Sequence, residues 1–82
     1  MPTLHEILCP LPGTFYRRSA PDAPPYKSDG DSVLVGEVIG LVEVMKQFSE
    51  VTAEVAGRIK SFAVENGDPV DPGQVVAVIE AE

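Results

Sequence analysis

The sequence predicts an all-β domain made of two related halves. Eight prolines and seven glycines in 82 residues leave little room for helices. Valine and isoleucine, which favour pleated sheet, are prominent among the apolar residues. Val51, Ala53 and Val55 alternate with Thr52 and Glu54, which is the period of a half-buried strand.

Further strands are predicted from apolar segments bounded by turn signals. Asp-Gly at 29–30, Asn-Gly at 66–67 and Pro-Gly at 72–73 mark turns between them. The predicted strands are SVLVG (32–36), GLVEV (40–44), residues 48–55, RIKSFAV (58–64) and QVVAVIEA (74–81), with the first strand of the first unit placed near PGTFY.

The two halves match each other at an offset of 37 residues, as from Gly30 to Gly67. Both contain the motif G-D-x-V-x-x-G-x-V, followed by an apolar strand that ends in glutamate. Each motif glycine is expected to serve a turn or a close backbone approach. The matched pairs are Gly30-Asp31 with Gly67-Asp68, Val33 with Val70, Gly36 with Gly73, Val38 with Val75, Val42 with Ile79 and Glu43 with Glu80. We expect the two units to pack face to face about a pseudo-twofold axis.

An insertion interrupts the first unit. Gly13 matches Gly57 at an offset of 44 instead of 37, so the first unit holds seven extra residues within RRSAPDAPPYKS (17–28). Its three prolines exclude a central strand and favour a stiff, extended protrusion at about residues 19–27. Composition alone allows either a surface loop that tolerates an insertion or a rigid finger that covers a ligand.

Composition excludes several classes of function. The net charge of −7 argues against nucleic-acid binding and favours partners with basic surfaces. With Cys9 and His5 as the only cysteine and histidine, a metal cluster is not expected, and Cys9 is predicted to be a small buried residue. The N-terminal MPTLHEILCPLP does not resemble a signal peptide, and no segment approaches the roughly 20 apolar residues of a membrane-spanning helix. These bounds predict a cytoplasmic protein with one domain, residues 1–82.

Lys46 is expected at the tip of a tight hairpin where the first unit passes into the second. Catalytic lysines are activated by burial or by neighbouring cations, and Glu43 and Glu50 provide neither. A protruding amine is better suited to be the substrate of another enzyme. No nucleophile–base pair or phosphate-binding loop is evident, so the chain is not predicted to be an enzyme.

The segment GLVEVMKQFSEV resembles the attachment motif of biotinyl domains, commonly E-A-M-K-M. Glu43, Met45 and Lys46 match that motif. PLPGTFYRRSAPDAPPY and VENGDPVDPGQVVAVIE resemble other segments of the biotin carboxyl carrier protein family of acetyl-CoA carboxylase, so that the resemblance runs from about residue 9 to residue 80.

The resemblance implies a barrel-sandwich hybrid, a flattened β-barrel of two four-stranded antiparallel sheets. It also implies that biotin protein ligase joins biotin to Lys46 and that Met45 is a recognition neighbour. The arm would then carry carboxylate from a biotin carboxylase subunit to a carboxyltransferase subunit. The insertion falls at the family's thumb, which implies that Pro21, Asp22, Ala23, Pro24, Pro25 and Tyr26 fold over the biotin ring.

Two motif positions depart from the family pattern. Val44 stands where alanine is usual, and Gln47 stands where a second methionine is usual. A β-branched residue suits a strand end, whereas Gln47 either weakens ligase recognition, alters the partner carboxylase or is neutral. The sequence also lacks the family's longer N-terminal region and Pro/Ala-rich linker.

Alternative functions share the same fold. A lipoyl domain of a 2-oxo acid dehydrogenase also carries a hairpin lysine, but it usually has aspartate before the lysine and alanine after it, and it lacks the thumb. A lipoyl-type glycine cleavage carrier needs a longer chain. An unmodified β-sandwich interaction module, with Lys46 incidental, is the remaining alternative.

Overall fold

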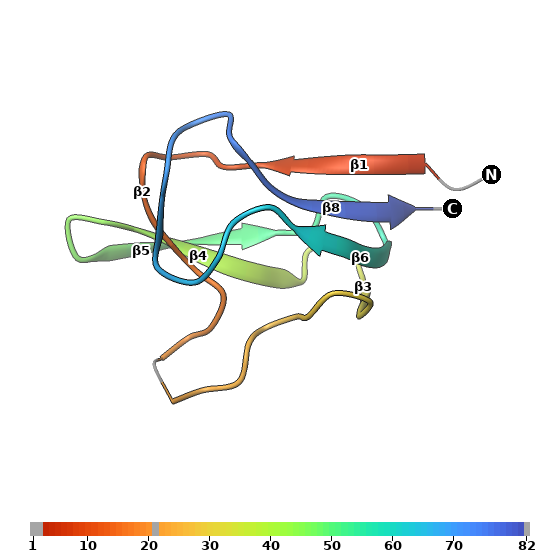
Figure 1. The fold of residues 1–82 in the computed structure, drawn as a ribbon, viewed down its shortest axis with the longest axis horizontal. Helices are drawn as coiled ribbons and strands as arrows, with labels where there is room; N and C mark the ends of the chain where they lie inside the picture. Colours follow the sequence, from red (N-terminus) through yellow and green to blue (C-terminus); the bar gives the residue numbers. More distant parts are fainter. Residues whose placement is uncertain (1–2, 21, 82) are drawn as a thin grey trace.

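The computed structural model describes residues 3–20 and 22–81, which form eight strands in two four-stranded antiparallel sheets (Figure 1). The predicted all-β class and two-sheet architecture are therefore confirmed. The strands are β1 (Thr3–Leu8), β2 (Gly13–Tyr16), β3 (Ser32–Val33), β4 (Val38–Val44), β5 (Gln47–Thr52), β6 (Gly57–Phe62), β7 (Asp68–Val70) and β8 (Val75–Ala81).

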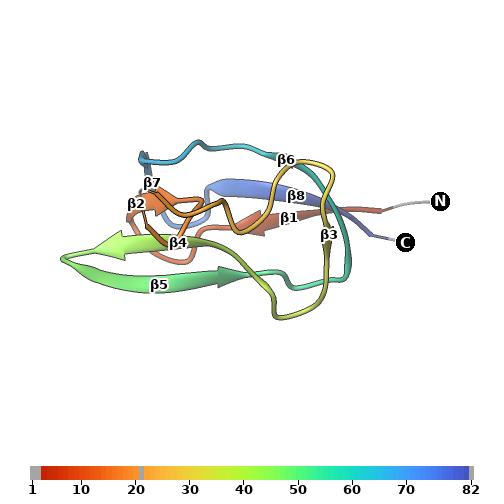
Figure 2. The same ribbon diagram turned by 90° about the horizontal axis from the view of Figure 1, so that it is seen from below.

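Each sheet takes two strands from each half of the chain. One sheet has the order β1-β8-β6-β3 and the other β5-β4-β2-β7. Figure 2 shows β4 and β5 in one layer, with β6 and β8 in the other. The prediction that two separate units pack face to face is wrong in this respect, because the halves exchange strands. Neither half can complete a sheet without the other.

The internal repeat is confirmed in backbone conformation and in hydrogen bonding. Gly30 and Gly67 have φ angles of 91°, and Gly36 and Gly73 have φ angles of 89° and 84°. The Gly30 N–H donates to the carbonyl of Ile59, and the Gly67 N–H donates to that of Phe15, both at 2.7 Å. The repeated Gly-Asp turns thus tie each half to the other.

Gly13 and Gly57, which match each other at an offset of 44 residues, also occupy equivalent places in the two halves of the fold. A Cβ atom on Gly13 would clash with the backbone carbonyl of Glu43, and one on Gly57 would clash with that of Glu80. Glycine is required at both positions because the neighbouring strand crosses too closely for any side chain. The seven-residue insertion therefore lies between Gly13 and Gly30, each of which has a structural equivalent in the second half of the chain.

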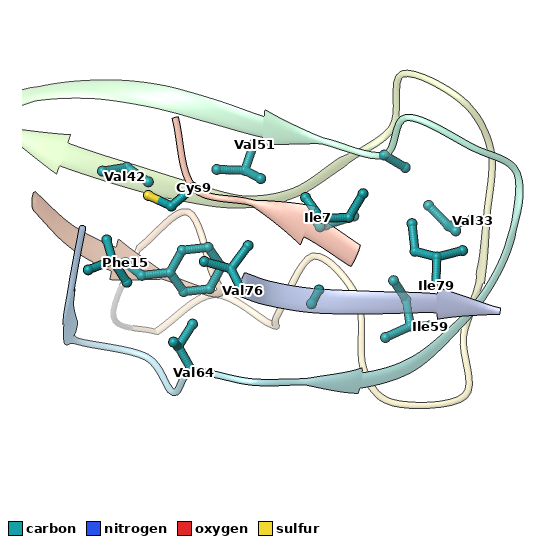
Figure 3. Packing of buried hydrophobic residues seen from close by; sticks show 14 residues of the cluster. Ile7, Cys9, Phe15, Val33, Val42, Val51, Ile59, Val64, Val76 and Ile79 are labelled. Carbon is teal, nitrogen blue, oxygen red and sulfur yellow. The ribbon is translucent and has the colours of Figure 1, made fainter. Parts of the chain in front are cut away.

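The core lies between the two sheets and is entirely apolar among the described residues (Figure 3). Phe15 is fully buried at its centre, on the short strand β2. Cys9 is 2% exposed and its thiol donates to the Leu11 carbonyl at 2.9 Å, which confirms the prediction of a buried residue. The other fully buried large side chains are Ile7, Ile39, Ile59, Ile79, Val33, Val42 and Val76.

Several strand predictions need correction. The strand predicted at 58–64 is Gly57–Phe62, and Asp68–Val70 forms β7, which was not predicted. SVLVG is a strand only at Ser32–Val33, because Gly36 has a positive φ and the Leu34 N–H donates to the Glu37 carboxylate within the turn. The strand after the hairpin is Gln47–Thr52 instead of 48–55. The segment Thr3–Leu8 forms β1, which the sequence did not predict because its outward positions mix polar and apolar residues.

Residues 17–31 form the loop that connects β2 to β3, and in Figure 1 it extends below the sheets. At its root the Tyr26 N–H donates to the Arg17 carbonyl at 2.8 Å, and Arg18 and Pro25 form an isolated antiparallel bridge. The Ala23 N–H donates to the Ala20 carbonyl at 3.0 Å nearer the tip. The part of the chain that is described contains no helix able to cross a membrane.

Candidate functional site

The candidate site is centred on the turn between β4 and β5, which forms one end of the molecule (Figure 1). Val44 pairs with Gln47, so only Met45 and Lys46 remain for the turn. Their φ angles are 52° and 67°, as a type I′ turn requires. The left-handed conformation costs roughly 1–2 kcal/mol per non-glycine residue. The predicted tight hairpin with Lys46 at its tip is confirmed.

Both turn residues project into solvent. Met45 is 91% exposed, and Lys46 is also exposed. Lys46 forms no ion pair with any carboxylate of residues 3–20 and 22–81. Its amine is accordingly accessible to a second protein, while the rigid sheet fixes the point from which the side chain extends.

The outer face of the β5-β4-β2 sheet carries a linked set of side chains beside the turn. The Tyr16 hydroxyl donates to the Glu43 carboxylate at 2.9 Å. Glu43 is the cross-strand partner of Phe48, whose ring lies 6.2 Å from that of Tyr16 at an interplanar angle of 52°. This hydrogen bond raises the pKa of Tyr16, with smaller contributions from burial and from the negative charge of Glu43. The motif glutamate is thus held by β2.

Two surface hollows flank the hairpin. One has a volume of 360 Å³ and is lined by Leu11, Val44, Met45, Gln47 and Ser49. The other has a volume of 280 Å³ and is lined by Tyr16, Arg18, Ser19, Ala20, Phe48 and Asn66. We call the second one the loop-side hollow. It joins the outer sheet face to the root of the 17–31 loop, next to the turn.

The structure brings together some of the predicted site residues and separates others. Val44, Met45 and Gln47 share one hollow, whereas Glu43 faces Tyr16. Of the residues predicted to cover a ligand, Pro21 lies outside the described residues, and Pro25 lines a neighbouring hollow with Arg17, Arg18, Glu65 and Asn66. Asp22, Ala23, Pro24 and Tyr26 do not line the loop-side hollow. Their role as a cover stays a prediction.

Sequence reasoning missed Tyr16, Phe48, Arg18 and Asn66, which line the loop-side hollow together with the loop residues Ser19 and Ala20. The aromatic pair had one available signal. Tyr16 follows the buried Phe15 and therefore faces outward on β2. Asn66 carried no comparable signal, because its place in the site depends on the hydrogen bond that its side-chain oxygen accepts from the Arg17 N–H at 2.8 Å.

The described residues contain no group of three or more histidine, cysteine, aspartate or glutamate side chains placed to hold a metal ion. His5 and Glu54 lie 3.4 Å apart and are both well exposed. The chemistry of the site is therefore that of a projecting amine beside a partly apolar hollow. These features fit a group attached covalently to Lys46.

A two-sheet β domain that presents a lysine on a left-handed turn has the architecture of a carrier modified by another enzyme. Residues 5–79 match the family described as "Biotin-requiring enzyme", and the chain belongs to this family. The resemblance predicted from the motif and the repeat is confirmed.

Individual relatives give the same result. The chain is 43% identical over 67 residues to the biotin carboxyl carrier protein of acetyl-CoA carboxylase from Chlamydia trachomatis, covering 82% of this chain and 41% of that protein. It is 41% identical over 73 residues to the protein of the same name from Pseudomonas aeruginosa, covering 89% and 47%. The chain thus spans less than half the length of these relatives.

A solved structure with the same fold is that of urea carboxylase from Kluyveromyces lactis. The TM-score is 0.77 at 28% sequence identity, and the match covers 94% of this chain and 6% of that one. The same arrangement of strands therefore occurs as a small part of a much larger protein.

The turn geometry predicts that Lys46→Gly stabilises the fold. Glycine adopts a φ of 67° without steric cost, and this gain exceeds the added freedom of the unfolded chain. We expect the free energy of unfolding, measured by urea denaturation, to rise by about 0.5–1 kcal/mol. Glu50→Gly, at an exposed and regularly paired position within β5, is the control and should lower it. Equal destabilisation by both changes would contradict the assigned strain.

The Tyr16–Glu43 hydrogen bond predicts a pH-dependent effect of Tyr16→Phe. The folded-state pKa of Tyr16 is raised above its usual value of 10.0, so its contribution to stability is complete below pH 10 and is lost as pH rises through the folded-state pKa. The difference in unfolding free energy between wild type and variant should be constant from pH 7 to about pH 9 and then shrink. In a Glu43→Gln background the decline should be weaker, because the carboxylate is the largest cause. A difference that does not change up to pH 11 would refute this assignment.

Proposed function

We propose that this chain is a biotin carrier and that Lys46 is the residue to which biotin is attached. The observation that carries the proposal is the exposed lysine on a type I′ turn, within a chain of the biotin-requiring family. The amine needs no activation by this protein, because the modifying enzyme supplies the activated acyl group. Biotin protein ligase is the partner that this role requires.

The residues around Lys46 have separate roles in this proposal. Met45 is 91% exposed and provides an apolar contact for the ligase at the tip. Glu43, held by Tyr16, presents a fixed carboxylate near the turn. Val44 and Gln47 form the last pair of the hairpin and set the register that places Lys46 at the end. Gln47 supplies an amide where relatives of this motif usually have a methionine.

The function of the proposed carrier is delivery. Once attached, biotin supplies a ureido nitrogen that accepts a carboxylate at a biotin carboxylase component and donates it at a carboxyltransferase component. This chain fixes the base of the arm and keeps the lysine in solvent, which raises the local concentration of the head group toward the mM range. The chain lowers no chemical barrier itself and is not an enzyme in this proposal.

The names of the relatives support acetyl-CoA carboxylase, and hence fatty acid synthesis, as the setting. Residues 1–82 would serve as a single carrier domain, whether alone or within a longer protein. A cytoplasmic location belongs to the same proposal and agrees with the free, buried thiol of Cys9. The surface of net charge −7 suits brief contacts with basic partner surfaces.

Co-expression with a biotin ligase tests the attachment site. The intact mass should increase by one biotinyl group, and Lys46→Arg should abolish the increase. Lys60→Arg, which makes the same change at an exposed lysine on strand β6, is the control and should be modified like the wild type. An unmodified wild-type chain would refute the proposal, and a lipoyl increment would identify a lipoyl carrier instead.

We further propose that the loop at about residues 19–27, the segment that contains the predicted thumb residues Pro21 to Tyr26, acts as a thumb over the arm. The loop-side hollow is lined in part by the first residues of this loop, Arg18, Ser19 and Ala20. The loop is also tied to the sheet by the bond from the Asn66 side chain to the Arg17 N–H. A cover fixed in this way restricts the head group without altering the hairpin.

Replacing residues 19–24 with a flexible Gly-Ser-Gly-Gly segment tests the thumb. Arg18 and Pro25 are bridge partners and the Tyr26 N–H already donates to the Arg17 carbonyl, so a short flexible segment can join them and leave both sheets intact. NMR relaxation of the biotin ring should show faster motion than in the biotinylated wild type, while the backbone amide spectrum of the strands is retained. Unchanged ring motion would mean that the loop does not contact the head group.

A further inference from the structure

The loop-side hollow contains a cation, Arg18, whose charge is not compensated within the described chain. The Nε of Arg18 is shielded from solvent and has no hydrogen-bond partner there. No carboxylate oxygen of residues 3–20 and 22–81 lies within 4.0 Å of its guanidinium. A guanidinium that is partly removed from water without a partner favours the approach of an anion.

Two neighbouring cations have contacts of other kinds, although the Nε of Arg17, like that of Arg18, has no hydrogen-bond partner in the described chain. Lys27 pairs with Glu37 at 3.1 Å, with its ammonium also donating to the Ser32 carbonyl at 2.9 Å. The guanidinium of Arg17 lies 4.1 Å from the centre of the Phe62 ring, on which it stacks. Arg18 is the only cation that lines the loop-side hollow.

Two other polar groups of this hollow, those of Asn66 and Ser19, can donate hydrogen bonds to a ligand. Asn66 uses its side-chain oxygen to accept the Arg17 N–H, so its amino group is the part left for a ligand. Ser19 contributes a hydroxyl, whereas the Tyr16 hydroxyl already donates to Glu43. Phe48 and Ala20 supply apolar wall. The hollow therefore suits a small group with an apolar body and a negatively charged edge.

The location of the hollow determines which group can enter it. Phe48 lies two residues beyond Lys46 on β5, a separation of about 7 Å along a strand. The four-carbon stem of the lysine, extended by the acyl chain of biotin, can turn back over this distance. The acidic chain, with a net charge of −7, otherwise disfavours an anion close to its surface.

We propose that the loop-side hollow is a subsite selective for the anionic, carboxylated head group of the arm, and that Arg18 provides the selectivity. The inference rests on the proposed function of Lys46 and adds a distinction between two states of the same arm. The uncarboxylated ureido head is neutral, whereas the carboxylated head carries a negative charge that Arg18 binds through a charge-assisted contact. The carrier thus holds its loaded arm more firmly than its empty arm.

The test compares the biotinylated protein before and after carboxylation. Intact mass first establishes that biotin is attached, so that failure of the proposed function is separated from failure of this inference. The carrier is then loaded by a catalytic amount of biotin carboxylase with ATP and 13C-bicarbonate. The Nε–H resonance of Arg18 and the side-chain amide resonances of Asn66 are followed in 15N-labelled protein.

Both sets of resonances should shift on loading of the wild type. In Arg18→Gln the Asn66 shift should be lost, and the preference of the hollow for the loaded over the empty head group should fall from about tenfold to about one. Arg58→Gln removes the same charge at an exposed position opposite Glu80, far from the hairpin, and should behave like wild type. Arg18→Lys keeps the charge but loses the planar fork, so it should retain part of the preference.

Three results would overturn the inference. They are an absence of any shift on loading of the wild type, an undiminished Asn66 shift in Arg18→Gln, and an equal loss of preference in Arg58→Gln. A shift seen only while carboxylase is bound would assign Arg18 to the partner interface instead. The strand amide spectrum of each variant establishes that it is folded.

Discussion

The whole site depends on the register of one hairpin. Because Val44 pairs with Gln47, two residues must reverse the chain, and both must adopt positive φ angles. Such a turn matches the right-handed twist of the flanking strands, and it directs its two side chains away from the sheet. A shift by one residue would turn Val42 from the core to the surface and move Lys46 from the tip. Burial of the strand therefore fixes the position of the lysine.

The choice of residues in this turn indicates a compromise between stability and function. Asn-Gly is the usual solution for a type I′ turn, yet Met45 and Lys46 occupy it here. Their strain is sustained by the surrounding sheet, whose core is apolar throughout its described part. Side-chain contacts that span the three strands β2, β4 and β5 add to this support, since the Tyr16 ring packs against Phe48 and its hydroxyl donates to Glu43.

The repeat could be predicted from the sequence because its requirements are local. A turn position with a φ near 90° favours glycine through the sterics of its own backbone, and the Gly-Asp motif recurs for that reason. The pairing of strands between the two halves is determined instead by contacts between residues that are distant in the sequence. An offset of 37 residues identifies equivalent strands, but it does not say whether β4 pairs with its own half or with the other one. The exchange of strands between sheets, and strand β1 at an edge, followed only from the three-dimensional arrangement.

The same distinction applies to the site. The proposed attachment motif occupies consecutive residues and could be identified from the sequence, whereas the loop-side hollow gathers Tyr16, Phe48 and Asn66 from three separate segments. Arg18 illustrates how the environment of a residue depends on which segments the fold brings together. In the sequence it is one half of a basic pair, but in the structure Arg17 stacks on Phe62 while Arg18 lines the hollow. In the proposed role the arm must leave and return, which requires contacts that are weak and conditional, and an uncompensated charge such as that of Arg18 meets this requirement without burying a large apolar surface.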